Sequence, residues 1–177
     1  MKKTIAILLV LVIGMVGVWA ATLSADLNLT TTVYEFSEMV ISSDLAHTWA
    51  TFDNTTTADV INTPSNLSAT INPYITTNQS VGYLHTRSNV RTGYTVNILA
   101  TRLTDDTKVI DYELYNDADL VYTTSATTPV YTIFVTKPAG TGMQYDNSEI
   151  LVKLTTTGDN LSAGSYSATV TFSYTTN

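Results

Sequence analysis

The chain has 177 residues, a formal net charge of −7 and no cysteine. Nucleic acids and anionic lipid surfaces are recognised by basic faces, so this acidic balance argues against both as partners. The chain is rich in threonine, and tyrosine is its commonest aromatic residue with 11 copies, a composition that favours β-structure. Because no disulfide can form, packing and backbone pairing must stabilise the fold.

The first expected element is an export signal over residues 1–20. Two lysines precede an apolar run from Ile5 to Trp19, and Val18 and Ala20 have the small side chains that a signal peptidase site requires. We expect cleavage after Ala20, giving a secreted protein without a membrane segment. Two alternatives stay open: an uncleaved anchor, since the run is close to the roughly 17 residues that span a bilayer, and a prepilin-type leader whose run forms a filament-core helix.

The mature chain then opens with an alternating segment, Ala21–Val33, which reads "ATLSADLNLTTTV". Such a segment buries one face and exposes the other. Its apolar set is Leu23, Ala25, Leu27, Leu29 and Val33. The alternation is compatible with a first strand of the chain's own fold and with a strand that pairs with a neighbouring molecule.

Short alternating segments separated by turns continue through residues 34–177, and none has a sustained helical period. They are 34–41, 45–52, 66–71, 81–86, 94–101, 109–115, 130–135, 149–154 and 163–174. This spacing predicts a single antiparallel β-sandwich of about eight strands. The stretch "SNVRTG" reads as a hairpin-like connection into 94–101. The last segment places five residues on one face: Tyr166, Ala168, Val170, Phe172 and Tyr174.

Three stretches resemble subunits that are assembled by donor-strand complementation. "SNVRTGYTVNILAT" followed by "VIDYELYND" resembles their middle part, and "LSAGSYSATVTFSY" resembles their closing motif. The opening "ATLSADLNLTTTV" is similar to the donor extension of alpha-type fimbrial pilins and of spore coat U-like secreted domains. The resemblance covers most of the mature chain in the same order.

The resemblance implies an immunoglobulin-like sandwich over residues 34–177 that residues 21–33 of a neighbouring copy complete. Such a head-to-tail contact does not close on itself, so it propagates as a fibre. The donor residues would be Leu23, Ala25, Leu27, Leu29 and Val33. The acceptor or chaperone-contact residues would be Tyr166, Ala168, Val170, Phe172 and Tyr174. The resemblance further implies a homopolymer at the cell surface, a periplasmic chaperone and an outer-membrane usher as partners, and a role in adhesion or biofilm.

No arrangement of residues in the sequence indicates an enzyme, a cofactor or a metal centre. His47 and His85 lack a spaced ligand partner, and we interpret them as ordinary polar or half-buried side chains. Asn116, Asp117 and Asp119 carry oxygen ligands that calcium accepts, but a solvated loop is the simpler interpretation. No phosphate loop, dinucleotide fingerprint or nucleophile elbow occurs.

Trp49 supports an alternative function. We interpret its ring first as core packing, and second as a platform on which a sugar stacks. Under the second interpretation the chain is a self-contained secreted binding module for a glycan or a host protein. Alternation by itself does not separate this module from the filament subunit.

Overall fold

The computed structural model describes residues 30, 31, 33, 35–49, 60–62, 66–105, 107–125, 130–156 and 158–177. Among these residues the only helical turn is η1, a 3₁₀ turn at Gly158–Asn160, and all other regular structure is β-strand. The predicted all-β class is therefore confirmed, and the antiparallel sheets are consistent with the predicted sandwich. This part of the chain contains no helix that is long and apolar enough to cross a bilayer.

The larger sheet has six strands. In spatial order they are β2 (Val60–Asn62), β1 (Ser37–Ser42), β3 (Gln79–Ser88), β10 (Gln144–Leu154), β7 (Tyr112–Asn116) and β8 (Asp119–Thr123). All neighbouring pairs are antiparallel except β1 and β2, which run parallel. The two longest strands, β3 and β10, lie in the middle of this sheet, and the pairing between them is its longest ladder.

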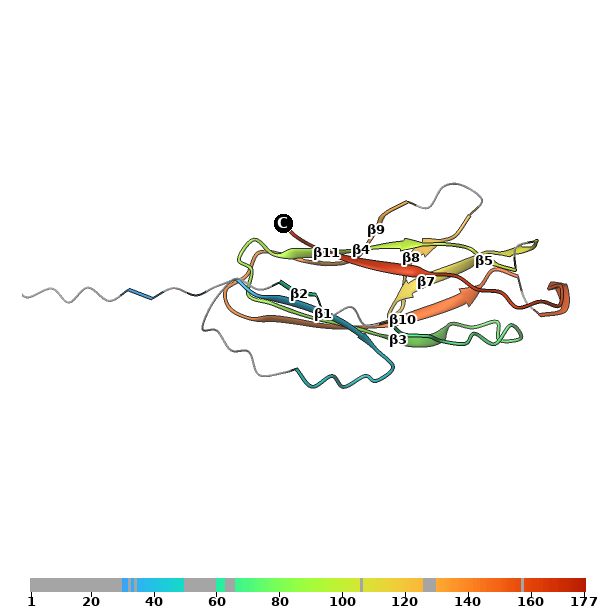
Figure 1. Cartoon of the computed structure of the whole chain (residues 1–177), viewed down its shortest axis with the longest axis horizontal. Helices are drawn as coiled ribbons and strands as arrows, with labels where there is room; N and C mark the ends of the chain where they lie inside the picture. Colours follow the sequence, from blue (N-terminus) through green and yellow to red (C-terminus); the bar gives the residue numbers. More distant parts are fainter. Residues whose placement is uncertain are drawn as a thin grey trace, which may run out of the picture. The chain divides into compact units, whose positions relative to one another are not determined.

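The smaller sheet has three strands in the order β11 (Val170–Thr176), β4 (Tyr94–Ala100) and β9 (Thr132–Lys137). Figure 1 shows β11 and β4 side by side in one layer, with β1, β3 and β10 in the other. A short pair, β5 (Leu103–Thr104) and β6 (Val109–Ile110), forms a third ladder. The smaller sheet therefore covers only part of the larger one.

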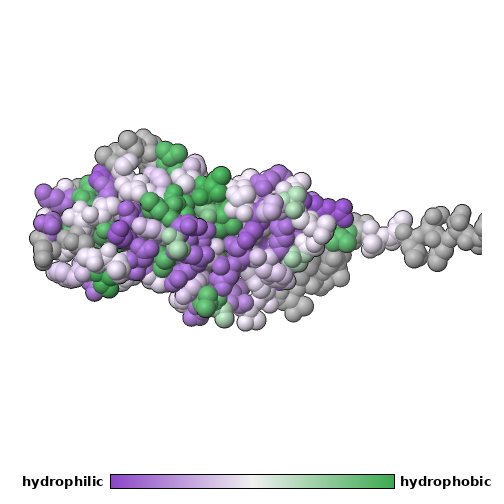
Figure 2. Space-filling model, turned by 180° about the vertical axis from the view of Figure 1, so that it is seen from behind, coloured by the Kyte–Doolittle hydropathy of each residue, from purple (hydrophilic) through white to green (hydrophobic). Residues whose placement is uncertain are grey.

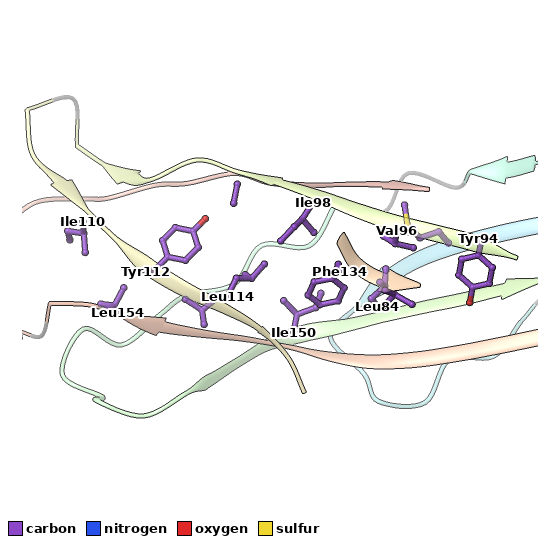
Figure 3. Packing of buried hydrophobic residues seen from close by; sticks show 14 residues of the cluster. Leu84, Tyr94, Val96, Ile98, Ile110, Tyr112, Leu114, Phe134, Ile150 and Leu154 are labelled. Atoms are coloured by element: carbon purple, nitrogen blue, oxygen red, sulfur yellow. The ribbon is translucent and has the colours of Figure 1, made fainter. Parts of the chain in front are cut away.

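The core lies between the two sheets, and Figure 3 shows its side chains pointing toward one another. In β4 the residues alternate strictly between buried and half-buried, as the pattern at 94–101 predicts. The largest side chains of this cluster that are almost fully buried are Tyr94, Leu84, Ile98, Leu114 and Val96. Each aliphatic side chain removed from water stabilises the fold by about 1.5–3 kcal/mol.

One end of the interior is lined by hydroxyl groups in place of apolar side chains. Ser37 Oγ shares hydrogen bonds of 2.9 Å with Ser88 Oγ and with Tyr174 Oη. Thr86 Oγ1 and Tyr94 Oη are 2.6 Å apart, and burial raises the pKa of Tyr94 to about 12. These bonds join β1 and β3 to the smaller sheet and satisfy polar groups that burial removes from water.

The connection "SNVRTG" is not a hairpin, because β3 and β4 belong to different sheets. The expected strand at 66–71 does not form, and the described part of the segment expected at 45–52 also lies outside any strand. The final strand begins at Val170 and not at residue 163. An alternating pattern marks a segment that can bury one face, but it does not specify the strand with which that segment pairs.

Candidate functional site: an open strand edge and an outer-face pocket

β11 forms one edge of the smaller sheet. It pairs antiparallel with β4 in the register Val170↔Ala100, Phe172↔Ile98 and Tyr174↔Val96. On its other side, the described residues place no strand. An edge of this kind presents a row of backbone donors and acceptors that another strand can pair with.

The inward side chains of β11 are less buried than their partners on β4. Ala100, Ile98 and Val96 are 0–3% exposed, whereas Val170, Phe172 and Tyr174 are only half-buried although they pack on the same core. Paired residues of the ladder point to the same side of the sheet. The greater exposure of the β11 side chains therefore comes from the far side of β11, where no described strand covers them. The core therefore leaves apolar surface uncovered along this edge.

Aromatic contacts hold β11 in place despite its partial exposure. The Phe172 ring meets the Phe134 ring edge-on with centroids 5.2 Å apart, and the Tyr174 ring stacks on Tyr94 at 4.9 Å. Such pairs add about 0.5–1.5 kcal/mol beyond the area they bury. With the bond from Tyr174 to Ser37, β11 is fixed to both sheets.

The other two predicted acceptor residues lie before β11. Tyr166 is half-buried and its hydroxyl donates to the Ser162 carbonyl oxygen at 3.0 Å, whereas Ala168 is exposed. Between them, Ser167 forms a two-bond bridge with Thr104. The five predicted residues thus share one C-terminal segment, but only three of them lie in the β11 ladder.

The predicted donor residues Leu23, Ala25, Leu27 and Leu29 lie outside the described residues, as does the predicted signal at 1–20. Val33, the fifth donor residue, is described and is 69% exposed. Its side chain is therefore not packed into the core.

On the outer face of the larger sheet, Arg87 lies between two aromatic rings. Its guanidinium carbon is 4.8 Å from the centroid of Phe36 and 4.8 Å from that of Trp49. Its Nη2 and Nε also contact Glu38 Oε2, at 2.7 Å and 2.9 Å. Segment 43–49 thus continues from β1 across the outer face, and Trp49 covers a buried ion pair.

His47 of segment 43–49 and His85 of β3 lie against each other on the same face. Their rings stack with centroids 5.2 Å apart, and His47 also meets Trp49 edge-on at 4.5 Å. Nε2 of His85 is 3.0 Å from Ser42 Oγ and 3.1 Å from the Asp44 carbonyl oxygen. Burial lowers the pKa of His85, and the charge of His47 lowers it further, whereas the bond to Asp44 opposes the shift. Burial therefore favours the neutral form of His85.

Beside the histidines is a shallow pocket of about 400 Å³. It lies between segment 43–49 and the outward residues of β10, and its lining is Leu45, Ala46, His47, Trp49, His85, Tyr145, Asp146 and Asn147. Asn147 Nδ2 donates to the Leu45 carbonyl oxygen at 2.8 Å and holds the segment against β10. From the sequence, only Trp49 was considered as a binding residue, and both histidines were interpreted as ordinary polar side chains. Tyr145 and Asn147 were missed because only the β3–β10 register brings them to the pocket.

The oxygen-rich stretch at Asn116–Asp119 has a structural role. Asp117 has a positive φ of 53° in the turn between β7 and β8, its backbone N donates to the Glu149 carbonyl oxygen, and its Oδ1 accepts from the Glu149 backbone N, both at 2.9 Å. Asn116 Nδ2 donates to the Phe134 carbonyl oxygen at 2.9 Å. Among the described residues, no three His, Cys, Asp or Glu side chains are grouped to hold a metal ion.

Exposed apolar side chains also occur on or beside β8 and β9: Leu120, Val130, Tyr131 and Ile133. The view from behind shows hydrophobic residues gathered on a surface that is otherwise largely polar (Figure 2). More than half of a typical protein surface is contributed by apolar atoms, so this area by itself identifies no partner.

Comparisons with protein-family models, with curated proteins and with solved structures found no match to this chain. Three features of the chain bear on its function: the edge of β11, the outer-face pocket and the motifs in the sequence.

Proposed function

We propose that this chain is the structural subunit of an extracellular pilus- or fimbria-like filament, in which residues 21–33 of one copy add a strand along β11 of the next. The observation that carries the proposal is the contrast across the β4–β11 ladder, where Phe172 is half-buried and its partner Ile98 is almost fully buried. An added strand would pair with the open backbone edge and cover the apolar surface at the same time.

The strand order supports an immunoglobulin-like version of this subunit. In that fold, one sheet has the order A-B-E-D and the other C-F-G. The order β1-β3-β10-β7 corresponds to A-B-E-D, and β4-β11 corresponds to C-F. The place of strand G would then lie beside β11, which is the edge that the described residues leave open.

Residues 21–33 have the pattern that such a place requires. Burying Leu23, Leu27, Leu29 and Val33 at roughly 1.5–3 kcal/mol each gives about 10 kcal/mol before the cost of ordering the segment. Each ladder hydrogen bond adds about 0.5–1.5 kcal/mol. The exposure of Val33 favours donation to a second copy over packing within the same chain. Secretion, a cell-surface location and a chaperone with an outer-membrane usher belong to this proposal through the resemblance.

The test combines deletion with peptide rescue. Full-length protein should form fibres in negative-stain microscopy, and a variant lacking residues 21–33 should be monomeric. That variant should bind the synthetic peptide ATLSADLNLTTTV, but not the same peptide with Leu27→Asp and Leu29→Asp, because the two aspartates would place charges against the core.

The self-contained module gives the opposite results. Its full-length protein is a stable monomer in size-exclusion chromatography, and neither peptide binds it. Fibres that persist without residues 21–33 would also overturn the proposal.

A further inference from the structure

The outer-face pocket is built from three parts of the chain: segment 43–49, His85 on β3, and residues 145–147 of β10. Segment 43–49 forms one wall, held by the bond from Asn147 to the Leu45 carbonyl oxygen and by the stack of His47 on His85. The other wall is the outward face of β10 at Tyr145 and Asn147. Because hydrogen bonds and ring contacts fix both walls, the pocket is formed without a ligand, as most small-molecule sites are.

The lining combines aromatic surface with polar groups. Trp49 and Tyr145 supply rings, and His47 and Asn147 supply hydrogen-bonding groups. Tyr145 is 60% exposed as a residue, so it remains accessible although it borders the pocket. Trp49 is half-buried and already contacts Arg87 and His47, so it acts as a fixed wall.

Two ion pairs lie beside the pocket. Arg87 is bound to Glu38 behind Trp49, and the Asp146 carboxylate is bound to Lys137. No lysine or arginine is among the lining residues. Phosphates and carboxylates are recognised by arginine and lysine, so an anionic ligand finds no partner here. The ligand that fits is neutral, has hydroxyl groups and offers an apolar face to a ring.

We propose that this pocket binds a neutral saccharide. The Tyr145 ring stacks on the C–H face of a sugar ring, and Asn147 and His47 form hydrogen bonds with its hydroxyls. The pocket is shallow, which suits one or two sugar units at the end or along the side of a longer glycan. This inference does not depend on the filament, since the pocket lies on the outer face of the larger sheet and β11 belongs to the smaller one.

The test uses matched tyrosine variants. Tyr145→Ala removes the stacking ring, and Tyr131→Ala is the control, because Tyr131 is 64% exposed and lies beside β9, away from the pocket lining. Trp19 and Trp49 are the only tryptophans in the chain. In the full chain carrying Trp19→Phe, fluorescence therefore reports on Trp49 alone. The probes are mannose-, galactose- and N-acetylglucosamine-terminated oligosaccharides, with sialylated oligosaccharides as the anionic comparison.

We expect at least one neutral oligosaccharide to change the Trp49 fluorescence in a saturable way. Tyr145→Ala should weaken this binding by about tenfold or more, whereas Tyr131→Ala should leave it unchanged. Tyr145→Phe keeps the ring and should bind within about threefold of the parent chain, which also guards against misfolding of the alanine variant. The inference is overturned if no neutral probe binds, if only sialylated probes bind, or if the two alanine variants lose binding equally. An equal loss in Tyr145→Phe and Tyr145→Ala would overturn the stacking role.

Discussion

Ile98 and Phe172 are partners across the β4–β11 ladder, yet Ile98 is 1% exposed and Phe172 is only half-buried. Both point into the same core, and Phe172 also contacts the ring of Phe134. Among the described residues the smaller sheet therefore ends at β11 with part of its apolar surface uncovered. This relationship between two neighbouring side chains underlies the filament proposal.

Replacing Phe172 tests how much the exposed side of the core contributes. Phe172→Ala removes the edge-on contact with Phe134 and should lower the free energy of unfolding by about 2–3 kcal/mol, less than for a fully buried ring. Urea unfolding measures the change. Thr171→Ala is the control, because Thr171 is exposed on the opposite face of β11. Equal losses for the two variants would contradict the inward packing of Phe172.

The bond between Ser37 and Tyr174 joins the two sheets and should be measurable by itself. Tyr174→Phe removes the hydroxyl but keeps the stack on Tyr94, and should cost about 0.5–1.5 kcal/mol. A double-mutant cycle with Ser37→Ala isolates the pair, and we expect a coupling energy above about 0.5 kcal/mol. Strict additivity would mean that the bond contributes nothing to stability.

The buried pair of Arg87 and Glu38 should be sensitive to removal of either partner. Arg87→Ala leaves the Glu38 carboxylate without its partner in a buried site and also removes both ring contacts, so the expected loss is about 3–5 kcal/mol. Arg87→Lys keeps the charge and should cost less. Lys153→Ala is the control, since the pair of Lys153 with Glu113 is more exposed and its loss should change stability little. Thermal and urea unfolding measure all three variants.

His85 should make stability depend on pH. Its pKa in the folded protein lies below the usual value of 6.5, so the unfolded chain binds the proton more tightly. The free energy of unfolding should therefore be unaffected by His85 above about pH 7 and fall as the pH drops through 6.5 toward the folded-state pKa. His85→Gln keeps a hydrogen-bonding side chain and should reduce this slope in unfolding measurements between pH 7.5 and 5. A slope identical to that of the parent chain would contradict the burial of neutral His85.

Both the backbone dihedral angle and the closeness of neighbouring atoms require a glycine at position 93. It has a φ of +85°, and a Cβ added there would lie 2.3 Å from the Lys137 carbonyl oxygen. Gly142 has a φ of +96°, but nothing lies within 4 Å of its added Cβ. Gly142→Ala should therefore cost only the conformational strain, about 1–2 kcal/mol, and Gly93→Ala should cost clearly more. Equal losses in urea unfolding would show that the close approach to Lys137 can relax.

Several features of the fold could be predicted because they depend on neighbouring positions in the chain. The alternation in 94–101 predicted a strand with one buried face, and β4 has it over Tyr94–Ala100. The strand expected at 109–115 appears as β6 and β7, interrupted at Asp111. Asp111 binds Arg102 through its side chain, and its backbone carbonyl accepts from Thr155 at 3.1 Å. That interruption depends on partners distant in sequence, which a local pattern does not contain.

The candidate site was harder to predict for the same reason. Trp49 was considered as a sugar platform on its residue type alone, whereas its edge-on contact with His47 is known only from the structure. Tyr145 and Asn147 lie about one hundred positions later and enter the pocket only through their register with Arg87 and His85 on β3. The strand predicted at 45–52 was wrong for its described part, residues 45–49. There Trp49 packs on Arg87, and its neighbours cross the outer face of the sheet without joining a ladder.

The sequence by itself determined that this chain is built from strands, since a repeat of two residues is a local property that needs no knowledge of partners. Only the tertiary structure decided which strands are neighbours, that β11 is the last described strand of its sheet and has half-buried side chains, and that a pocket forms beside two stacked histidines. Those features arise from pairing between segments far apart in the chain. Which segments pair depends on the free energy of all contacts in the packed core, and a local pattern does not contain those contacts.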